Sequence, residues 1–260
     1  MSGRALVTGA AQRLGRAMAL HLAERGHDVA VHYAGSAEAA AETVAEIRAL
    51  GRRAVALRAD LLDEDETQAL VPRAAEALGG PLTVLVNNAS IFEYDTIRTA
   101  TRESWDRHLG SNLRAPFVLM QGLAAGVTEP ARDAAGEALA TGLVVNVIDQ
   151  RVLKPTPEFM TYTLAKMGLW ALTRTAAQAL APAIRVNAIG PGPTLKGARQ
   201  SEDHFARQRA STVLERGADP GDICAALDYL LTARAVTGQL ICVDGGQHLG
   251  WRTPDVLGVE

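Results

Sequence analysis

Tyr162 and Lys166 lie four residues apart in a segment with helical periodicity. At that spacing two side chains share one face of a helix, so the ammonium group can lie beside the phenol. A tyrosine with an ordinary pKa of about 10 is a poor acid–base group at neutral pH, and a nearby cation lowers that pKa. The pair is therefore a candidate for proton transfer during hydride chemistry, although this spacing also arises by chance on helix surfaces.

A glycine-containing turn runs from Thr8 to Gly15, between a predicted strand at residues 4–8 and a predicted helix at 14–24. Gly9 permits a tight turn, Gly15 permits close packing of helix against strand, and the N-terminus of the helix can hold a phosphate. Ordinary strand-to-helix turns also use glycine. Because this turn opens the domain at the expected place, it predicts a dinucleotide site.

The end of the second predicted strand indicates which dinucleotide binds. Residues 32–36 contain no carboxylate, whereas a carboxylate there would select NAD by bonding the ribose 2′-hydroxyl. Ser36 and Arg13 are candidate partners of a 2′-phosphate. The sequence therefore predicts NADP(H), and the absence of a basic residue just before Ser36 leaves the strictness of that preference open.

Strand-like and helical segments alternate along the chain. Predicted strands cover residues 4–8, 29–33, 53–57, 82–86, 143–148, 184–189 and 240–243, and predicted helices cover residues 14–24, 37–50, 64–78, 111–127, 159–180 and a segment that starts near 219. Several strands are continuous apolar runs, as in a parallel sheet covered on both faces. The pattern predicts a single-domain, Rossmann-type α/β fold, a doubly wound parallel sheet of about seven strands with helices on both faces.

Two segments, residues 129–142 and 194–212, have no regular apolar pattern. The second is polar and follows a Pro-Gly-Pro sequence, so it is either a substrate lid or a surface excursion. We therefore expect residues 1–250 to form one NADP-binding catalytic domain with a lid around 194–212, followed by a C-terminal tail at 251–260.

Composition excludes several classes of protein. The 260 residues are 48% hydrophobic and carry a net charge of −3, which is unlike a disordered chain or a basic nucleic-acid-binding surface. There is no long apolar run for a membrane span and no pattern of a secretory signal. The two cysteines, Cys224 and Cys242, fit neither a disulfide scaffold nor a metal motif. We expect a cytoplasmic protein with a small-molecule substrate, no metal, and no nucleic-acid or membrane partner.

The chain resembles the short-chain dehydrogenase/reductase family along nearly its whole length. The motifs that carry this resemblance are Thr8-Gly9-x-x-x-x-x-Gly15, Asp60-Leu61, Asn87-Asn88-Ala89, Asn112, Tyr162-x-x-x-Lys166, Arg185-Val186-Asn187, Pro191-Gly192 and Val243-Asp244-Gly245-Gly246. The resemblance implies that Tyr162 and Lys166 are catalytic, that Asn112 supports the proton relay and that Lys166 also holds the nicotinamide ribose. It implies a homotetramer, in which the tail could reach a neighbouring subunit or be disordered.

The resemblance also implies a cofactor cleft. Asp60 and Leu61 would lie beside the adenine, and Asn88 and Ala89 would line the cleft. The complete predicted cofactor-binding set is Thr8, Gly9, Arg13, Leu14, Gly15, His32, Tyr33, Ser36, Asp60, Leu61, Asn88, Ala89, Ser90, Lys166, Pro191 and Gly192.

Two residues depart from the common family pattern. Arg13 replaces the middle glycine of the loop, and Asp149 replaces the usual serine thirteen positions before Tyr162. These departures resemble the pteridine reductase branch, which includes dihydromonapterin-reductase-like bacterial proteins. That branch shares a Thr-Gly-Ala-Ala-x-Arg-Leu-Gly loop, an Asn-Asn-Ala-Ser-x-Phe segment that ends here at Phe92, and an Asp-Tyr-Lys set.

The branch implies roles for four substrate-contacting candidates, Arg13, Phe92, Asp149 and Tyr162. Phe92 could stack on a flat pterin ring or be a core aromatic. Arg13 could bridge the pterin and the cofactor phosphates or contact phosphate alone. Asp149 could relay a proton with Tyr162 or merely replace the serine as a hydrogen-bonding group.

Three functions follow from these residues. The first is an NADPH-dependent reductase that transfers hydride to a pterin ring C=N, of the dihydropterin-to-tetrahydropterin type. The second is a family member that acts on another carbonyl or alcohol substrate. The third is a non-catalytic NADP-binding regulatory protein, which the presence of Asn112, Tyr162 and Lys166 together disfavours.

Overall fold

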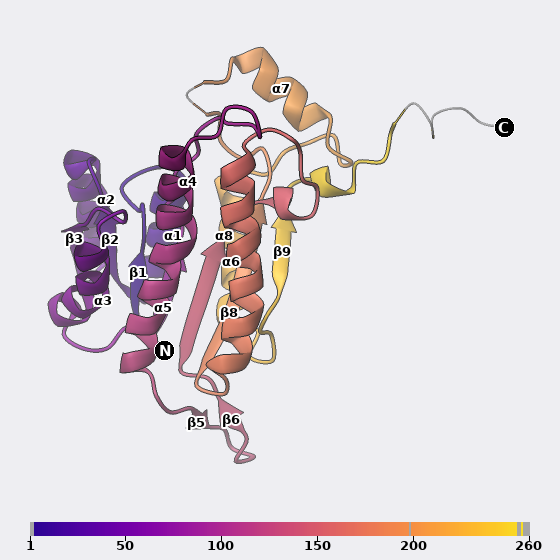
Figure 1. Ribbon diagram of the computed structural model, residues 1–260. Coiled ribbons are helices and arrows are strands. Elements are labelled where there is room, and N and C mark those ends of the chain that lie inside the picture. Colours follow the sequence, from indigo (N-terminus) through magenta and orange to yellow (C-terminus); the bar gives the residue numbers. More distant parts are fainter. Residues whose placement is uncertain (1–2, 198, 254–255, 257–260) are drawn as a thin grey trace.

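Seven parallel strands form the central sheet of the protein in the computed structural model, which describes residues 3–197, 199–253 and 256 (Figure 1). The strand order is β3-β2-β1-β4-β7-β8-β9. The strands are β1 (Arg4–Val7), β2 (Asp28–Tyr33), β3 (Ala54–Arg58), β4 (Val84–Asn87), β7 (Gly142–Val147), β8 (Ile184–Pro191) and β9 (Leu240–Val243). The order reverses direction between β1 and β4, and such a switch point opens a crevice at the carboxyl ends of the strands.

Helices cover both faces of this sheet. One apolar cluster joins α1 (Arg13–Glu24), α2 (Ala37–Ala49) and α8 (Pro220–Thr232) to the sheet, and a second joins α3 (Glu64–Leu78), α5 (Ala115–Gly126) and α6 (Met160–Ala179). Within β1, Ala5 and Val7 belong to the first cluster and Leu6 to the second, because successive side chains point to opposite faces. The predicted doubly wound, single-domain fold is confirmed.

The segments without an apolar pattern contain short elements. Residues 129–142 include an antiparallel pair, β5 (Ala131–Arg132) and β6 (Ala138–Leu139). Residues 194–212 include α7 (Glu202–Ala210), which has no buried residue and so leaves no apolar stripe in the sequence. Whether this segment acts as a lid stays a prediction, and its residue 198 lies outside the described residues.

The predicted helix at 111–127 is two elements. A π-helical turn (Gly110–Arg114) follows α4 (Arg102–Leu109) and precedes α5. Single-turn π segments inside helices are frequent at functional sites.

Short 3₁₀ helices cover Gln150–Val152 and Gln247–Leu249. Within the described ranges, none of the helices has the length and apolar character needed to cross a membrane. Residues 254–255 and 257–260 of the expected tail lie outside the described residues.

Three buried polar side chains cross-link the sheet to α6. The amide of Asn87 donates to Asn146 Oδ1 at 2.8 Å, and Asn146 Nδ2 donates to Thr173 Oγ1 at 2.9 Å. Thr173 in turn donates to the carbonyl of Leu169 at 2.8 Å. Since Asn146 and Thr173 are fully buried, each hydrogen bond replaces one that water would otherwise supply.

We predict that Thr173→Val destabilises the protein by about 1–3 kcal/mol, because valine keeps the shape but leaves the buried Asn146 amide without its acceptor. Urea unfolding measures the change. Thr175→Val is the matched control, since this exposed threonine on the same helix bonds only to nearby helix carbonyls. Equal unfolding free energies for the two variants would contradict the prediction.

Candidate active site

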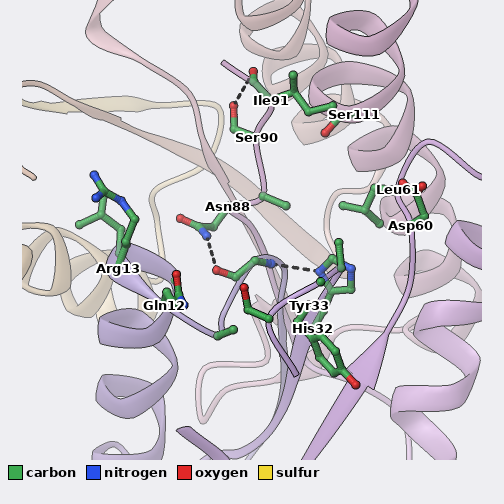
Figure 2. A pocket seen from close by; sticks show the side chains of 18 of the residues that line it. Gln12, Arg13, His32, Tyr33, Asp60, Leu61, Asn88, Ser90, Ile91 and Ser111 are labelled. Atoms are coloured by element: carbon green, nitrogen blue, oxygen red, sulfur yellow. Dashed lines mark hydrogen bonds between the residues drawn. The ribbon is translucent and has the colours of Figure 1, made fainter. Parts of the chain in front are cut away.

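A cavity of about 540 Å³ lies at the carboxyl ends of β1, β2 and β4, where the strand order reverses (Figure 2). Most of the predicted cofactor residues line it: Gly9, Arg13, Leu14, Gly15, His32, Tyr33, Ser36, Asp60, Leu61, Asn88, Ala89, Ser90 and Gly192. Thr8, Lys166 and Pro191 are not in its lining. In Figure 2, Arg13 and Gln12 lie on one side of the cavity and Asp60 and Leu61 on the other.

Hydrogen bonds join the turns after β1 and β4. The Thr8 hydroxyl accepts from the backbone N–H groups of Asn88 at 2.9 Å and Ala89 at 3.0 Å. The Asn88 amide donates to the carbonyls of Thr8 at 2.8 Å and Gly9 at 3.2 Å. A Cβ on Gly15 would lie 2.1 Å from the Gly9 oxygen. The two turns therefore form one packed unit that only glycine at position 15 permits.

His32 fixes the glycine loop from the side of β2. Its Nδ1 accepts a hydrogen bond from the Gly9 N–H at 3.0 Å, and its Nε2 lies 3.1 Å from the Ala59 carbonyl. This pattern requires a neutral ring with its proton on Nε2. Burial lowers the pKa of His32, which keeps the ring neutral. The predicted contact of His32 with the cofactor stays a prediction, and the structure shows that His32 anchors the glycine loop.

The cavity fits a dinucleotide at two helix N-termini. Gln12, the N-cap of α1, and Ser36, the N-cap of α2, make no side-chain capping hydrogen bond within the described chain. The first-turn N–H groups of both helices therefore have no side-chain cap and can receive phosphate oxygens. Ser36 lines the cavity, so its hydroxyl is also available to a ligand there.

Arg13 has an unusual backbone conformation. Its φ is 55°, in the left-handed region that suits the glycine usually found at this place in the family. A non-glycine residue there costs about 1–3 kcal/mol, which points to a role for its side chain. Its guanidinium donates to the carbonyls of Lys196 at 3.0 Å and Leu195 at 3.1 Å. Arg13 thus joins the glycine loop to the segment predicted to be a lid.

Tyr162 and Lys166 lie on α6 and meet Asp149 at the end of β7. The Tyr162 hydroxyl donates to Asp149 Oδ2 at 3.0 Å. The other carboxylate oxygen of Asp149 accepts from the Arg151 N–H at 2.8 Å. Lys166 Nζ donates to the Val147 carbonyl at 2.9 Å and lies 5.7 Å from the centroid of the Tyr162 ring. The predicted Asp-Tyr-Lys set is therefore assembled in space.

The electrostatics of this set differ from the expectation that Lys166 lowers the phenol pKa. Burial, followed by the charge of Asp149, raises the pKa of Tyr162 well above its ordinary value. Burial also raises the pKa of Asp149 and lowers that of Lys166 to about 8. The expected lowering of the Tyr162 pKa is wrong for this structure, because the phenol is buried and hydrogen-bonds to the Asp149 carboxylate. The phenol stays protonated, as a proton donor must.

Asn112 lies in the π-helical turn and is fully buried. Its Oδ1 accepts from the Ile91 N–H at 2.9 Å, and its Nδ2 donates to the Ile91 carbonyl at 2.8 Å. Both polar atoms of the side chain thus hold the backbone of the turn after β4. Through this turn Asn112 supports the residue that follows, Phe92.

Phe92 is 43% exposed, so it is not a core aromatic. Its ring stacks on that of Phe159 at a centroid distance of 4.3 Å and meets Tyr162 edge-on at 4.6 Å. Phe159 was missed in the sequence. Its position one helical turn before Tyr162 could have been recognised from the sequence. Its left-handed backbone conformation, with φ of 55°, could not. An exposed aromatic surface therefore lies next to the phenol.

Comparisons with known proteins show the family to which the chain belongs. A family model described as enoyl-(acyl carrier protein) reductase matches residues 9–248. The 3-oxoacyl-[acyl-carrier-protein] reductase FabG of Staphylococcus aureus is 34% identical over 254 residues, covering 96% of this chain and 99% of that protein. A crystal structure of FolM alternative dihydrofolate reductase 1 from Brucella suis, in complex with NADP, is 41% identical, with a TM-score of 0.90 over 98% of both chains. A short-chain dehydrogenase from Burkholderia cenocepacia in complex with NADP is 33% identical, with a TM-score of 0.84 over 94% of this chain and 97% of that one.

We predict that Gly15→Ala weakens NADPH binding at least tenfold, because the added methyl group would push the Gly9 carbonyl out of the loop. Fluorescence titration with NADPH measures the dissociation constant. Gly221→Ala is the control, since an added Cβ there meets no atom within 4 Å. Unchanged affinity in the Gly15 variant would show that the loop does not shape the cofactor site.

Proposed function

Because the chain belongs to the short-chain dehydrogenase/reductase family, we propose that it is an NADPH-dependent reductase of a pterin ring C=N bond. The observation that carries the proposal is the hydrogen bond from Tyr162 to the half-buried Asp149 at 3.0 Å, beside the exposed ring of Phe92. Reduction of C=N places a proton on nitrogen, so it needs a protonated donor near a surface that holds a flat heterocycle. The sequence identity of 41% and 40% to two crystal structures of FolM alternative dihydrofolate reductase 1 supports the same substrate class.

The protein uses NADP(H), as do the related reductases crystallised with it. When bound, NADPH supplies the hydride. The glycine loop and the first turn of α1 would hold its pyrophosphate, and Ser36 its 2′-phosphate. Lys166 would hold the nicotinamide ribose, which is the role that the family resemblance implies.

The proton steps use groups of the chain itself. Tyr162, whose pKa is raised, donates its hydroxyl proton to the ring nitrogen of the substrate. Asp149, whose pKa burial also raises, can take up a proton from solvent and pass it to the tyrosine oxygen after the transfer. The Lys166 ammonium stabilises the negative charge that develops on that oxygen during the transfer. Asn112 supports the relay by holding the turn that precedes Phe92.

Substrate binding is assigned to two side chains. Phe92 would stack on one face of the pterin. Arg13 would reach both pterin and phosphate through its forked donors. We further propose that residues 194–212 act as a lid, which is supported by the Arg13 hydrogen bonds to Leu195 and Lys196 and by Arg199, whose guanidinium lies 5.7 Å from the centroid of the Phe92 ring. A cytoplasmic homotetramer is the assembly expected from the family.

A second candidate is reduction of another carbonyl. It is favoured by the 34% identity to the FabG protein, which is named as a 3-oxoacyl-[acyl-carrier-protein] reductase. Tyr162 and Lys166 would serve ketone reduction as well, so the two candidates differ chiefly in what Arg13, Phe92 and Asp149 do.

Tyr162→Phe removes the proposed proton donor while keeping the ring. We expect kcat to fall by about 10²–10⁴-fold, the usual contribution of general acid catalysis, with NADPH affinity changed less than about twofold. Steady-state kinetics and NADPH titration measure the two quantities. Tyr229→Phe, on an exposed face of α8, is the control. Turnover by the Tyr162 variant at the parent rate would show that Tyr162 is not the proton donor.

Asp149→Ser separates the two candidate substrates, because serine keeps a hydrogen-bonding group but cannot carry the relayed proton. We expect at least a tenfold loss of kcat with a dihydropterin and little loss with a ketone. Kinetics with both substrates measure the ratio, and the exposed Asp65→Ser is the control. Equal effects on both substrates would contradict the special role of Asp149.

A further inference from the structure

Three buried polar side chains that the proposed mechanism does not use lie next to Tyr162. Asp95, His108 and Thr161 are 2%, 0% and 2% exposed. Asp95 Oδ1 accepts from the Thr161 N–H at 3.1 Å, and its other oxygen accepts from the Thr161 hydroxyl. The Thr161 hydroxyl lies 2.6 Å from His108 Nδ1, and the His108 ring meets the Tyr162 ring edge-on at a centroid distance of 6.0 Å. The cluster therefore contacts Tyr162 through the His108 ring.

The hydrogen bonds of this cluster have one consistent direction. The Glu93 N–H donates to His108 Nε2 at 3.1 Å, so that nitrogen carries no proton. His108 Nδ1 must then carry the proton and donate it to the Thr161 hydroxyl. That hydroxyl donates to an Asp95 oxygen that also accepts from the Ser104 hydroxyl at 3.1 Å. Burial lowers the pKa of His108 and so keeps the ring in the neutral form that this chain of bonds requires.

Asp95 also serves as the cap of α6. The residue at the N-cap position is Phe159, which has no hydrogen-bonding side chain and a φ of 55°. The carboxylate of Asp95, from a loop 66 residues before Thr161 in the sequence, binds the first-turn N–H instead. A negative charge at that place also favours the positive end of the helix. The first turn of α6, which carries Tyr162, is thus held by the loop that carries Phe92.

The loop that carries Phe92 is also hydrogen-bonded to α4 and to the π-helical turn that follows it. His108 accepts from the backbone of Glu93, and Asn112, four residues further on, binds both backbone groups of Ile91. His108 consequently bridges two parts of the site, with one ring nitrogen on the loop around Phe92 and the other on the turn that precedes Tyr162.

We propose that Asp95, His108 and Thr161 are positioning residues that hold Phe92 and Tyr162 in the mutual arrangement needed for proton transfer to a stacked substrate. The proposal rests on the functions assigned above to Tyr162 and Phe92. It assigns these three residues no contact with substrate or cofactor.

The test compares Thr161→Val with Thr161→Ser. Valine keeps the shape and the backbone bond to Asp95 but removes the hydroxyl bonds to His108 and Asp95, whereas serine keeps the hydroxyl. We expect the valine variant to lose about 10- to 100-fold in kcat, since a small misplacement of reacting groups has effects of this size. The KM for NADPH should stay within about twofold, because the cluster does not line the cofactor cavity. The serine variant should recover kcat to within about threefold of the parent.

Thr173→Val, on the same helix, is the control for a loss of stability alone, because its hydroxyl bonds to Asn146 at 2.9 Å rather than to the cluster. It should unfold more easily than the parent and keep the parent kcat. If Thr161→Val behaves in the same way, the cluster is only structural and the proposal is overturned. If Thr161→Val does not fold, Asp95→Asn takes its place, since it keeps the carbonyl acceptor of the helix N–H and replaces the oxygen that accepts from the Thr161 and Ser104 hydroxyls.

The outcome is distinguishable from a failure of the proposed function. Tyr162→Phe is measured beside these variants with the same substrate. Parent-level turnover in Tyr162→Phe would overturn the assigned proton donor. Loss of turnover in Tyr162→Phe, together with an unchanged kcat in Thr161→Val, would overturn the positioning proposal alone.

Discussion

The hydrogen bond between Tyr162 and Asp149 is the interaction around which the site is built. It joins the first turn of α6 to the end of β7, and it lies in a place where burial raises the pKa of both groups. A carboxylate withdrawn from water is costly unless its oxygens are bonded, and the oxygens of the half-buried Asp149 accept from the phenol and from the Arg151 N–H. Lys166, bonded to the carbonyl of Val147, fixes the same helix against the same strand. The two neighbouring elements thus hold a phenol, a carboxyl group and an ammonium group within one small volume.

Departures from regular structure are found at this site. Arg13 and Phe159 both adopt left-handed backbone conformations, one in the glycine loop and one at the start of α6. Their side chains reach the segment after β8 and the ring of Phe92, respectively. The strands of the central sheet and the long helices follow the apolar pattern of the sequence, and a third left-handed residue, Glu215, lies outside this site. Strain of this kind persists only where the surrounding packing enforces it.

The fold was predictable because its strands are apolar runs and its long helices have an apolar face. The α7 helix and the β5–β6 pair were not, since neither buries enough apolar surface to leave a periodic pattern. The glycine loop and the Tyr162–Lys166 pair were readable from residue type and spacing, and Asp149 was identified through the resemblance to the pteridine reductase branch. The raised pKa of Tyr162, the anchoring role of His32 and the contact between Asp95 and Thr161 were not readable, because each depends on burial or on a partner distant in the sequence.

Substrate choice is the central claim, and NADPH oxidation by the purified protein tests it most directly. The measurement sets dihydrobiopterin, dihydromonapterin and dihydrofolate beside a 3-oxoacyl thioester and simple ketones, at equal enzyme and NADPH concentrations. If Asp149, Phe92 and Arg13 serve pterin reduction, kcat/KM for at least one dihydropterin will exceed that for every ketone by tenfold or more. Turnover of the thioester or a ketone with no turnover of any dihydropterin would contradict the account.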